Sequence, residues 1–276
     1  LTPIIPLAIM MIFSKNISRR HLFLLVPSLI NMIVVVLSPF GRFIFTVDAD
    51  NHYSRGDFYL IFIAVYTINF LLLVISTLKV GKKHNYPLQW KMLVLSVFTI
   101  TGTTIQIIDP TAYSSWHCVT LALFLYFILM AEFDSSFDTL TGLYNRAAFD
   151  KASSQIVKNR PFSLIILDIN DFKSINDTYG HYFGDTVIKQ VADIVRSSFK
   201  KHYTCYRFGG DEFSIIGHET DRGKIETQLR TMTKTLTALR EKGSPLPTIS
   251  YGYSLHQADE PLDFDKVLKE ADDQMY

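Results

Sequence analysis

The chain has 276 residues, a length typical of about two domains. Its formal net charge is only +1, which gives no electrostatic reason to expect a nucleic acid as partner. The long apolar runs precede residue 133 and charged, mixed sequence follows it, so the composition predicts a membrane half and then a soluble half. The two cysteines, Cys118 and Cys205, fall one in each half, which argues against a disulfide framework and is typical of a reduced, intracellular second half.

Residues 1–133 are expected to form a membrane region of about five spans. A membrane-spanning helix needs roughly 20 mostly apolar residues, a length that the third apolar run meets without a charge. The chain opens inside the first run, so that span is expected to be truncated. The alternative, a soluble all-α domain with buried helices, is disfavoured by the number of such runs. The runs are residues 3–13, 22–40, 58–78, 92–108 and 117–133.

Loop charges predict the orientation of these spans. Lysine and arginine dominate the charges of residues 14–21 and 79–91, whereas residues 41–57 are balanced by aspartates and residues 109–116 carry no basic side chain. The positive-inside rule therefore places the two basic loops in the cytoplasm, and with them everything after Glu132. We expect a multi-pass membrane protein with a cytoplasmic second half.

Few polar groups interrupt the membrane half. Asn31 and Asn69 are the main ones, and we expect them to form hydrogen bonds between helices. The outer loop from Asp48 to Asp57 could bind a metal or a small ligand, but a solvated loop is the simpler interpretation. No motif identifies a sensory ligand, so the signal stays open.

The junction between the halves combines a helical and a turn pattern. Phe133 and Phe137 lie four residues apart, so a short helix is expected to continue from the last span until a Thr-Gly pair interrupts it. A new helix is expected from Asn145, as N-cap, to about Lys158. A helix that leaves the membrane and stops at a tight turn would serve as a mechanical relay, although a plain spacer has the same pattern.

The second half alternates helices and strands. Residues 162–168 form an almost continuous apolar run rich in branched side chains, which predicts a central, buried strand that ends in Asp168. The order of the elements predicts an α/β or α+β sandwich with a mixed sheet and helices packed on it. The other expected elements are a short polar loop at 170–180, a helix at 183–199, a hairpin at 205–217, a helix at 219–242, a strand at 248–254 and a helix at 264–276.

Acidic side chains are expected to meet at one edge of this sheet. Asp168 ends the central strand, and Asp211 and Glu212 follow the two glycines at the tip of the hairpin. Glycine tolerates positive φ and the close approach of other groups, although an ordinary solvated turn is an alternative reading of this tip. Converging carboxylates repel one another unless a cation neutralises them, and Mg²⁺ prefers one or two carboxylates with phosphate oxygens and water.

The neighbouring polar side chains suit a nucleotide. Lys173, on the loop expected after the strand, could reach a phosphate, and Asn176 and Asp185 offer the amide and carboxylate that would pair with guanine. A Walker-type glycine-rich loop is absent from the sequence, so a P-loop nucleotidase is excluded. The pattern indicates a palm-like two-metal site, where metals activate a 3′-hydroxyl to attack an α-phosphate.

Three ordered motifs carry a family resemblance. Residues Asp138 to Arg146 read Asp-Thr-Leu-Thr-Gly-Leu-Tyr-Asn-Arg, a second signature runs from Leu167 to Asp185, and Arg207 leads into Gly-Gly-Asp-Glu-Phe. Together they resemble the GGDEF family of diguanylate cyclases, which join two GTP molecules into cyclic di-GMP and release two pyrophosphates. The resemblance covers residues 134–276. It implies a palm-like nucleotidyl-cyclase fold attached to a multi-span sensor region in a bacterial cell membrane.

The resemblance also implies residue roles and an assembly. Each domain would hold one GTP, so that catalysis needs a homodimer. The metal, Mg²⁺ or Mn²⁺, would be bound by carboxylates and one backbone carbonyl, and the catalytic acids would activate the 3′-hydroxyl. The implied residues are Asp168, Ile169 (carbonyl), Asp211 and Glu212 for the metals, Asp211 and Glu212 for catalysis, Asn176, Asp185 and Ile188 around guanine, and Phe172 and Lys173 on the phosphate side.

The sequence departs from the family pattern at three places. Asn170 stands where a second aspartate is usual, and we expect activity to survive this change. Residues 200–203 read Lys-Lys-His-Tyr in the place of the family's Arg-x-x-Asp product-inhibition motif, so that feedback site is expected to be absent. The chain ends before the lysine and arginine that usually hold the triphosphate, so it is expected to be C-terminally truncated. A non-catalytic receptor that binds GTP or only dimerises remains the alternative function.

Overall fold

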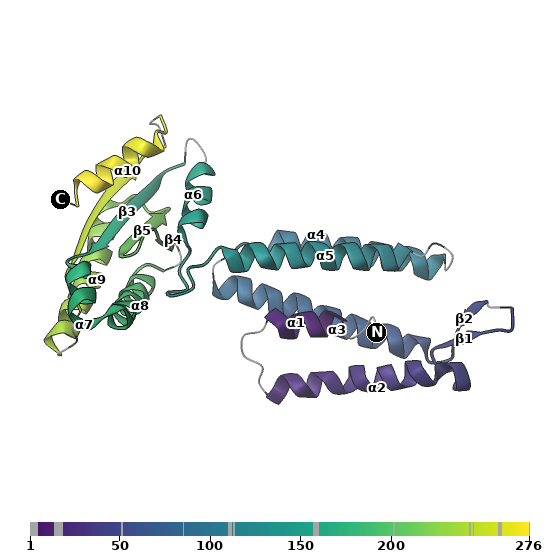
Figure 1. Ribbon diagram of the computed structural model, residues 1–276. Coiled ribbons are helices and arrows are strands. Elements are labelled where there is room, and N and C mark those ends of the chain that lie inside the picture. The colour runs from purple at the N-terminus through teal and green to yellow at the C-terminus, as the bar shows by residue number, and fades with distance from the viewer. Residues whose placement is uncertain are drawn as a thin grey trace. The chain divides into compact units, whose positions relative to one another are not determined.

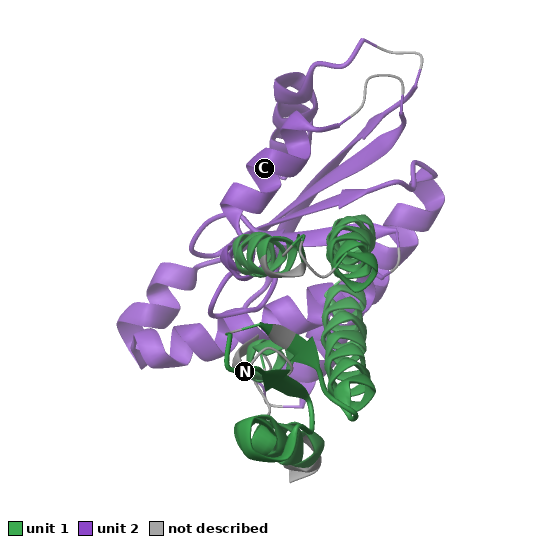
Figure 2. Cartoon of the chain, turned by 90° about the vertical axis from the view of Figure 1, so that its right-hand side faces the viewer, with its two compact units in different colours: residues 1–130 green, residues 131–276 purple. Residues whose placement is uncertain are grey.

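The computed structural model describes residues 5–13, 19–50, 52–84, 86–109, 112, 114–156, 160–200, 202–242, 244, 246–258 and 261–275. The chain divides into two compact units, residues 1–130 and residues 131–276, which Figure 2 distinguishes by colour. Each unit has its own buried residues and is described here by itself.

Unit 1 is helical, and the described residues of each expected apolar run lie in a helix, except Phe58, which directly precedes α3 (Figure 1). Three segments are long and apolar enough to cross a membrane, namely Tyr59–Lys83, Gln89–Ile108 and His117–Ser135, and Leu25–Gly41 is apolar over a shorter length. Of the about five spans that the sequence predicts, three are therefore candidates among the described residues. The helices are α1 (Ile5–Phe13), α2 (Arg19–Gly41), α3 (Tyr59–Lys83), α4 (Gln89–Ile108) and α5 (Ser114–Ser135), the last of which runs on into unit 2.

The surface of these helices is apolar. Phe40 is 89% exposed, Ile108 79% and Leu60 76%, and many other large apolar side chains of α2 to α5 are exposed as well. A soluble all-α domain would bury such residues, whereas lipid solvates them. The chain is therefore a membrane protein, and the soluble alternative is not supported.

Polar side chains inside unit 1 follow the expectation in part. Asn69 Nδ2 donates to Ser28 Oγ of α2 at 2.7 Å, which is the expected bond between helices. Asn31 is buried, yet neither its amide nitrogen nor its oxygen has a hydrogen-bond partner in the described part of the chain. A single interhelical hydrogen bond of this kind contributes on the order of 1 kcal/mol, so Asn69 helps to fix α3 against α2.

The outer loop is more ordered than the sequence suggests. It forms an antiparallel hairpin of β1 (Phe45–Val47) and β2 (Tyr53–Arg55). Asp48 Oδ1 accepts hydrogen bonds from the backbone N–H groups of Asp50 and His52, so this carboxylate stabilises the turn. Within the described residues no group of three metal-ligating side chains gathers here or elsewhere.

Unit 2 is built on a four-stranded sheet with the order β4-β5-β3-β6 (Figure 1). All three neighbouring pairs are antiparallel, so the expectation of a mixed sheet was wrong. The chain between β3 and β4 is helical, and β4 runs parallel to β3. The two strands are not neighbours, because β5 lies between them and is antiparallel to both. The strands are β3 (Phe162–Ile169), β4 (Tyr203–Arg207), β5 (Glu212–Gly217) and β6 (Ile249–His256).

Both faces of the sheet are covered, because successive side chains of a strand point to opposite sides. Ile165 and Leu167 of β3 belong to a core cluster shared with α8 (His181–Ser198) and α9 (Arg222–Glu241). Phe162 and Leu164 belong to a second cluster shared with α6 (Arg146–Ser154) and α10 (Phe264–Asp273). By this alternation Asp168 lies on the second face, at the end of the strand.

Two helix starts bear on the sequence interpretation. Asn145 caps α6 as expected, with its side-chain oxygen accepting from the N–H of Ala148 at 2.9 Å, while the expected end near Lys158 lies outside the described residues. Residues 170–180, expected as a loop, contain the helix α7 (Phe172–Tyr179). A left-handed backbone at Asp171, with φ of 55°, turns the chain sharply from β3 into α7.

Candidate active site at the end of the central strand

The register of β3 and β5 brings the acidic residues together. Asp168 pairs directly with Glu212, and the N–H of Ile169 donates to the carbonyl of Asp211 at 3.3 Å. Directly opposed residues of an antiparallel pair present their side chains on the same face, with Cβ atoms about 5 Å apart. Asp168 and Glu212 therefore lie opposite each other at the end of the strand, with Asp211 next to Glu212 in the chain.

The electrostatics of this edge suit a cation. Burial, and then the negative charges of Asp211 and Glu212, raise the pKa of the half-buried Asp168. The repulsion would be relieved by a divalent ion, which prefers few carboxylates together with phosphate oxygens and water. Among the described residues the three side chains do not form a group of three metal ligands.

The two glycines of the turn meet one half of the expectation, the close approach of another group, and not the other, a positive φ. Neither Gly209 nor Gly210 has a positive φ. A Cβ atom on Gly209 would lie 2.6 Å from Glu212 Oε2, because the glutamate side chain folds back over the turn. The N–H groups of Phe208 and Gly209 both donate to the Glu212 carbonyl, at 2.9 and 3.3 Å. Gly209 is therefore needed for the close approach of a carboxylate, not for a left-handed backbone.

Arg207 stabilises this turn through hydrogen bonds, a role that the sequence interpretation missed. Its Nη1 donates to both carboxylate oxygens of Asp138, at 3.1 and 3.2 Å, and its Nη2 donates to the carbonyl of Gly210 at 2.8 Å. The Asp138 carboxylate also accepts from the N–H and hydroxyl of Thr141. Burial opposes its ionisation, but the bonds from Thr141 and Arg207 prevail and lower the pKa of Asp138. Both residues lie in the quoted motifs, but nothing in their spacing indicates that they meet.

The expected guanine-side residues lie on α7 and α8. Asn176 packs against Gly184, and its Oδ1 is buried with no hydrogen-bond partner in the described structure. Asp185 follows Gly184 and is exposed. Ile188 is 2% exposed and belongs to the core cluster between the sheet and its helices. An amide oxygen without a partner next to an exposed carboxylate leaves hydrogen-bonding capacity for a ligand.

The phosphate-side residues and Asn170 take positions that the sequence did not predict. Lys173 is exposed on α7 instead of on a loop, and Phe172 of the same helix packs partly against the core. Asn170 Nδ2 donates to Thr248 Oγ1 at 2.8 Å, and its Oδ1 accepts from Ser250 at 2.7 Å. Asn170 therefore ties the end of β3 to β6, which accounts for an amide at a position where the family usually has an acid.

Aromatic rings connect the start of unit 2 with the turn. Helix α5 ends at Ser135, so the expected continuation through Phe137 was wrong; Phe137 instead forms a β-bridge to Tyr144. Successive ring centroids lie 4.7 to 5.6 Å apart, within the range of attractive aromatic pairs. This ring chain, as we call it, consists in order of Phe133, Phe137, Tyr144, Tyr206, Phe149 and Phe208, and the last precedes Gly209.

Comparison with known proteins identifies the family of the second half of the chain. The family model described as "Diguanylate cyclase, GGDEF domain" matches residues 135–276, which is half of the chain. The chain belongs to the GGDEF family. The GGDEF domain is 34% identical over 148 residues to the diguanylate cyclase VdcA of Vibrio cholerae, covering 52% of this chain and 44% of VdcA.

Other relatives extend the comparison beyond the GGDEF domain. An uncharacterized membrane protein of Staphylococcus haemolyticus is 31% identical over 207 residues, covering 67% of this chain and 56% of that protein. The GGDEF domain of DgcB from Caulobacter crescentus, solved in complex with c-di-GMP, is 28% identical and covers 51% of this chain and 88% of that one, with a TM-score of 0.45. The chain spans about half the length of the curated relatives it matches.

Proposed function

We propose that the chain is a membrane-bound diguanylate cyclase, which condenses two GTP molecules into cyclic di-GMP and two pyrophosphates. The observation that carries the proposal is the direct pairing of Asp168 with Glu212 beside Asp211. Asn176 and Asp185 follow on the next two helices, α7 and α8. Such a site has carboxylates for a metal-bound triphosphate and a separate pair of polar groups for guanine. In the reaction, the 3′-hydroxyl of one GTP attacks the α-phosphate of the other and pyrophosphate leaves.

Each residue would contribute by position and charge. Mg²⁺ or Mn²⁺ held by Asp168, the Ile169 carbonyl and Asp211 would neutralise the phosphate oxygens. Glu212 would accept the proton of the attacking 3′-hydroxyl or help to bind a second ion. Asn176 and Asp185 would orient guanine, and Lys173 with Phe172 would contact the phosphate side. One domain offers one such set, so two chains would have to face each other for both nucleotides to react.

We further propose that the GGDEF domain is cytoplasmic and is gated by the membrane unit. The basic loop at 79–91 supports the orientation, and GTP is a cytoplasmic substrate. The ring chain supports gating, since it starts at the end of α5 and ends next to the turn. A displacement at one end of a closely packed series of rings reaches the other end, because no ring can move without displacing its neighbour.

The activity is tested with the full chain in lipid nanodiscs, GTP and Mg²⁺. Wild type is expected to form cyclic di-GMP, and Asp211→Asn is expected to lower the rate by at least about a hundredfold, because a carboxylate at the reacting phosphate is lost. Asp193→Asn is the matched control, since Asp193 is an exposed carboxylate of α8 paired only loosely with Arg196 at 3.5 Å. GTP binding without product in wild type would favour the non-catalytic receptor instead.

A second prediction concerns Gly184, which lies against the Asn176 side chain. In Gly184→Ala the new methyl group would collide with the Asn176 side chain, so Asn176 must move away from its present position. We expect the KM for GTP to rise by about tenfold, as for the loss of one buried hydrogen bond, with a smaller change in kcat.

The control for this prediction is Gly223→Ala in α9, where the nearest atom to an added Cβ is Asp221 Oδ1 at 3.3 Å. Steady-state kinetics and thermal unfolding are measured for both variants. An unchanged KM in Gly184→Ala, with a normal melting temperature, would remove Asn176 from the guanine site.

A further inference from the structure

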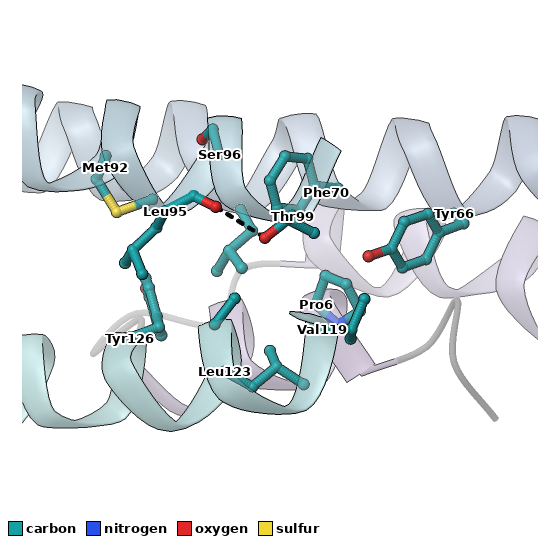
Figure 3. Close-up of a pocket in the computed structure, with 12 residues that line it drawn as sticks. Pro6, Tyr66, Phe70, Met92, Leu95, Ser96, Thr99, Val119, Leu123 and Tyr126 are labelled. Atoms are coloured by element: carbon teal, nitrogen blue, oxygen red, sulfur yellow. Dashed lines mark hydrogen bonds between the residues drawn. The ribbon is translucent and has the colours of Figure 1, made fainter. Parts of the chain in front are cut away.

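The cavity between α1, α3, α4 and α5 of the membrane unit is small (Figure 3). Its volume is about 30 Å³, and Leu95, Val119 and Leu123 are among its mostly apolar walls. That is room for about one or two water molecules, so the cavity is too small for a ligand. The GGDEF domain, by contrast, has a cationic side chain, Arg146, to which the fold and the proposed site give no role.

Arg146 is the first residue of α6, and its guanidinium lies over an aromatic ring. The Cζ atom is 4.6 Å from the centroid of the Phe208 ring. Arg146 is exposed and forms no ion pair with an acidic side chain in the described part of the chain, whereas Arg207 is paired with Asp138. Contact with a ring restrains the planar guanidinium and leaves its N–H groups for other acceptors.

The guanidinium lies on the same face of the sheet as the acidic residues. Phe208 packs against the second core cluster, which covers the face on which Asp168 lies. Glu212 is directly opposite Asp168 and therefore shares this face. The N–H of Phe208 donates to the Glu212 carbonyl at 2.9 Å, so the ring below Arg146 belongs to the residue that pairs with the start of β5. The cation and the carboxylates are thus presented at the same end of the same face.

A cation at this place matches the charge of the proposed substrate. A triphosphate with one divalent ion keeps a net negative charge, and the carboxylates of Asp168, Asp211 and Glu212 add to it. The guanidinium fork offers two parallel N–H donors to the oxygens of a phosphate group, which the compact ammonium of a lysine does not. Arg146 therefore has the charge, the donors and the position to bind a phosphate group beside the carboxylates.

We propose that Arg146 is a phosphate-binding residue of the active site, which holds the phosphates of GTP that leave as pyrophosphate. This inference rests on the proposed function, because it assigns a role within that reaction. When the 3′-hydroxyl oxygen bonds to the α-phosphorus, the bond from that phosphorus to the bridging oxygen breaks, and pyrophosphate leaves with the electron pair. A guanidinium at the leaving phosphates stabilises the negative charge that develops there.

The test measures nucleotide binding without turnover, with the full chain in lipid nanodiscs and Mg²⁺. The probe is guanosine 5′-[α,β-methylene]triphosphate, whose carbon bridge prevents the release of pyrophosphate, and GMP is the comparison because it lacks the leaving phosphates. Arg146→Met is expected to raise the Kd of the triphosphate about tenfold, as for one charge-assisted hydrogen bond, and the Kd of GMP less than about twofold. The methionine keeps an unbranched apolar side chain over Phe208, so the ring stays covered.

Arg222→Met is the matched control. Arg222 also lies over an aromatic ring, that of Tyr253 at 5.9 Å, but this ring packs against the core cluster on the other face of the sheet. Both Kd values should be unchanged in this variant. Arg146→Lys keeps the charge but not the fork, so its triphosphate Kd should lie between those of wild type and Arg146→Met.

Two results would overturn the role of Arg146. One is a triphosphate Kd in Arg146→Met equal to that of wild type, and the other is an equal loss of affinity for the triphosphate and for GMP. Cyclic di-GMP formation by wild type is measured in the same nanodiscs. The expected change of Kd in a wild type that forms no product would leave the phosphate site standing and refute the proposed cyclase activity, whereas product formation with an unchanged Kd in Arg146→Met would refute the phosphate site alone.

Discussion

Replacing Asp168 with asparagine is expected to abolish cyclic di-GMP formation and, at the same time, to stabilise the metal-free GGDEF domain. The activity should fall by at least about a hundredfold, because the neutral amide is a poor ligand for a divalent ion. The stability should rise by on the order of 1 kcal/mol, because the amide removes the repulsion from Asp211 and Glu212 in a partly solvated site. Product formation and thermal unfolding without metal measure the two effects.

The pH dependence of the free energy of unfolding distinguishes repulsion between the carboxylates from other causes of the stability gain in Asp168→Asn. Burial and the neighbouring carboxylates raise the folded-state pKa of Asp168 above its unfolded value of about 3.9. Below the unfolded pKa both states are protonated and the repulsion is absent, so the stability contributed by protonation is lost as the pH rises through the folded pKa. The advantage of Asp168→Asn over wild type should therefore grow with pH across this window and then stay constant.

Addition of Mg²⁺ with GTP should reverse the order of stability. Wild type gains stability from a ligand that binds only the folded state, whereas Asp168→Asn gains little. Asp193→Asn, which removes an exposed carboxylate elsewhere in unit 2, should show neither effect. An Asp168→Asn variant that is less stable than wild type without metal, or that still responds fully to Mg²⁺, would contradict the proposed cation site.

Most of the fold could be predicted because the spacing of apolar residues along the sequence follows which side chains are buried. The run at 162–168 is apolar on both faces, and the structure shows why, since clusters cover both sides of β3. The antiparallel arrangement was missed because the helices between β3 and β4 are typical of a parallel crossover, while the insertion of β5 depends on long-range pairing. The helix α7 was missed because it is only eight residues long and mostly polar, although Phe172, Ile175 and Tyr179 stand at helical spacing.

The residues that would carry the chemistry could be predicted from the sequence. The residues that hold them in place could not. The acids at Asp168, Asp211 and Glu212 could be placed at one edge because a strand end and a hairpin tip are both visible in the pattern. Arg207 could not be assigned to Asp138 from spacing, because the two lie 69 residues apart and meet only through the sheet. The ring chain also depends on three-dimensional packing and leaves no periodic signal.

Removing the Arg207 guanidinium is expected to loosen the turn at Gly209 and Gly210 and to destabilise unit 2 by about 2–3 kcal/mol. Its side chain is 15% exposed and that of Asp138 is 20% exposed, so the pair is mostly shielded from water. In Arg207→Ala the Asp138 carboxylate keeps only its bonds from Thr141, and the Gly210 carbonyl loses its donor. Hydrogen exchange should therefore accelerate at the N–H groups of Phe208 and Gly209, which define the turn.

A double-mutant cycle with Asp138→Ala tests whether the two residues act as a pair. If they do, Arg207→Ala should cost much less in the Asp138→Ala background than in wild type. The pair should also weaken in acid: its contribution is present above the unfolded pKa and is lost as the pH falls through the lowered folded pKa of Asp138. Arg222→Ala is the control, since its side chain is 73% exposed and solvent screens its pair with Glu226. Additive effects of Arg207→Ala and Asp138→Ala would show that the two motifs stabilise the turn independently, and the cyclase rate of each variant would then follow its own loss of stability.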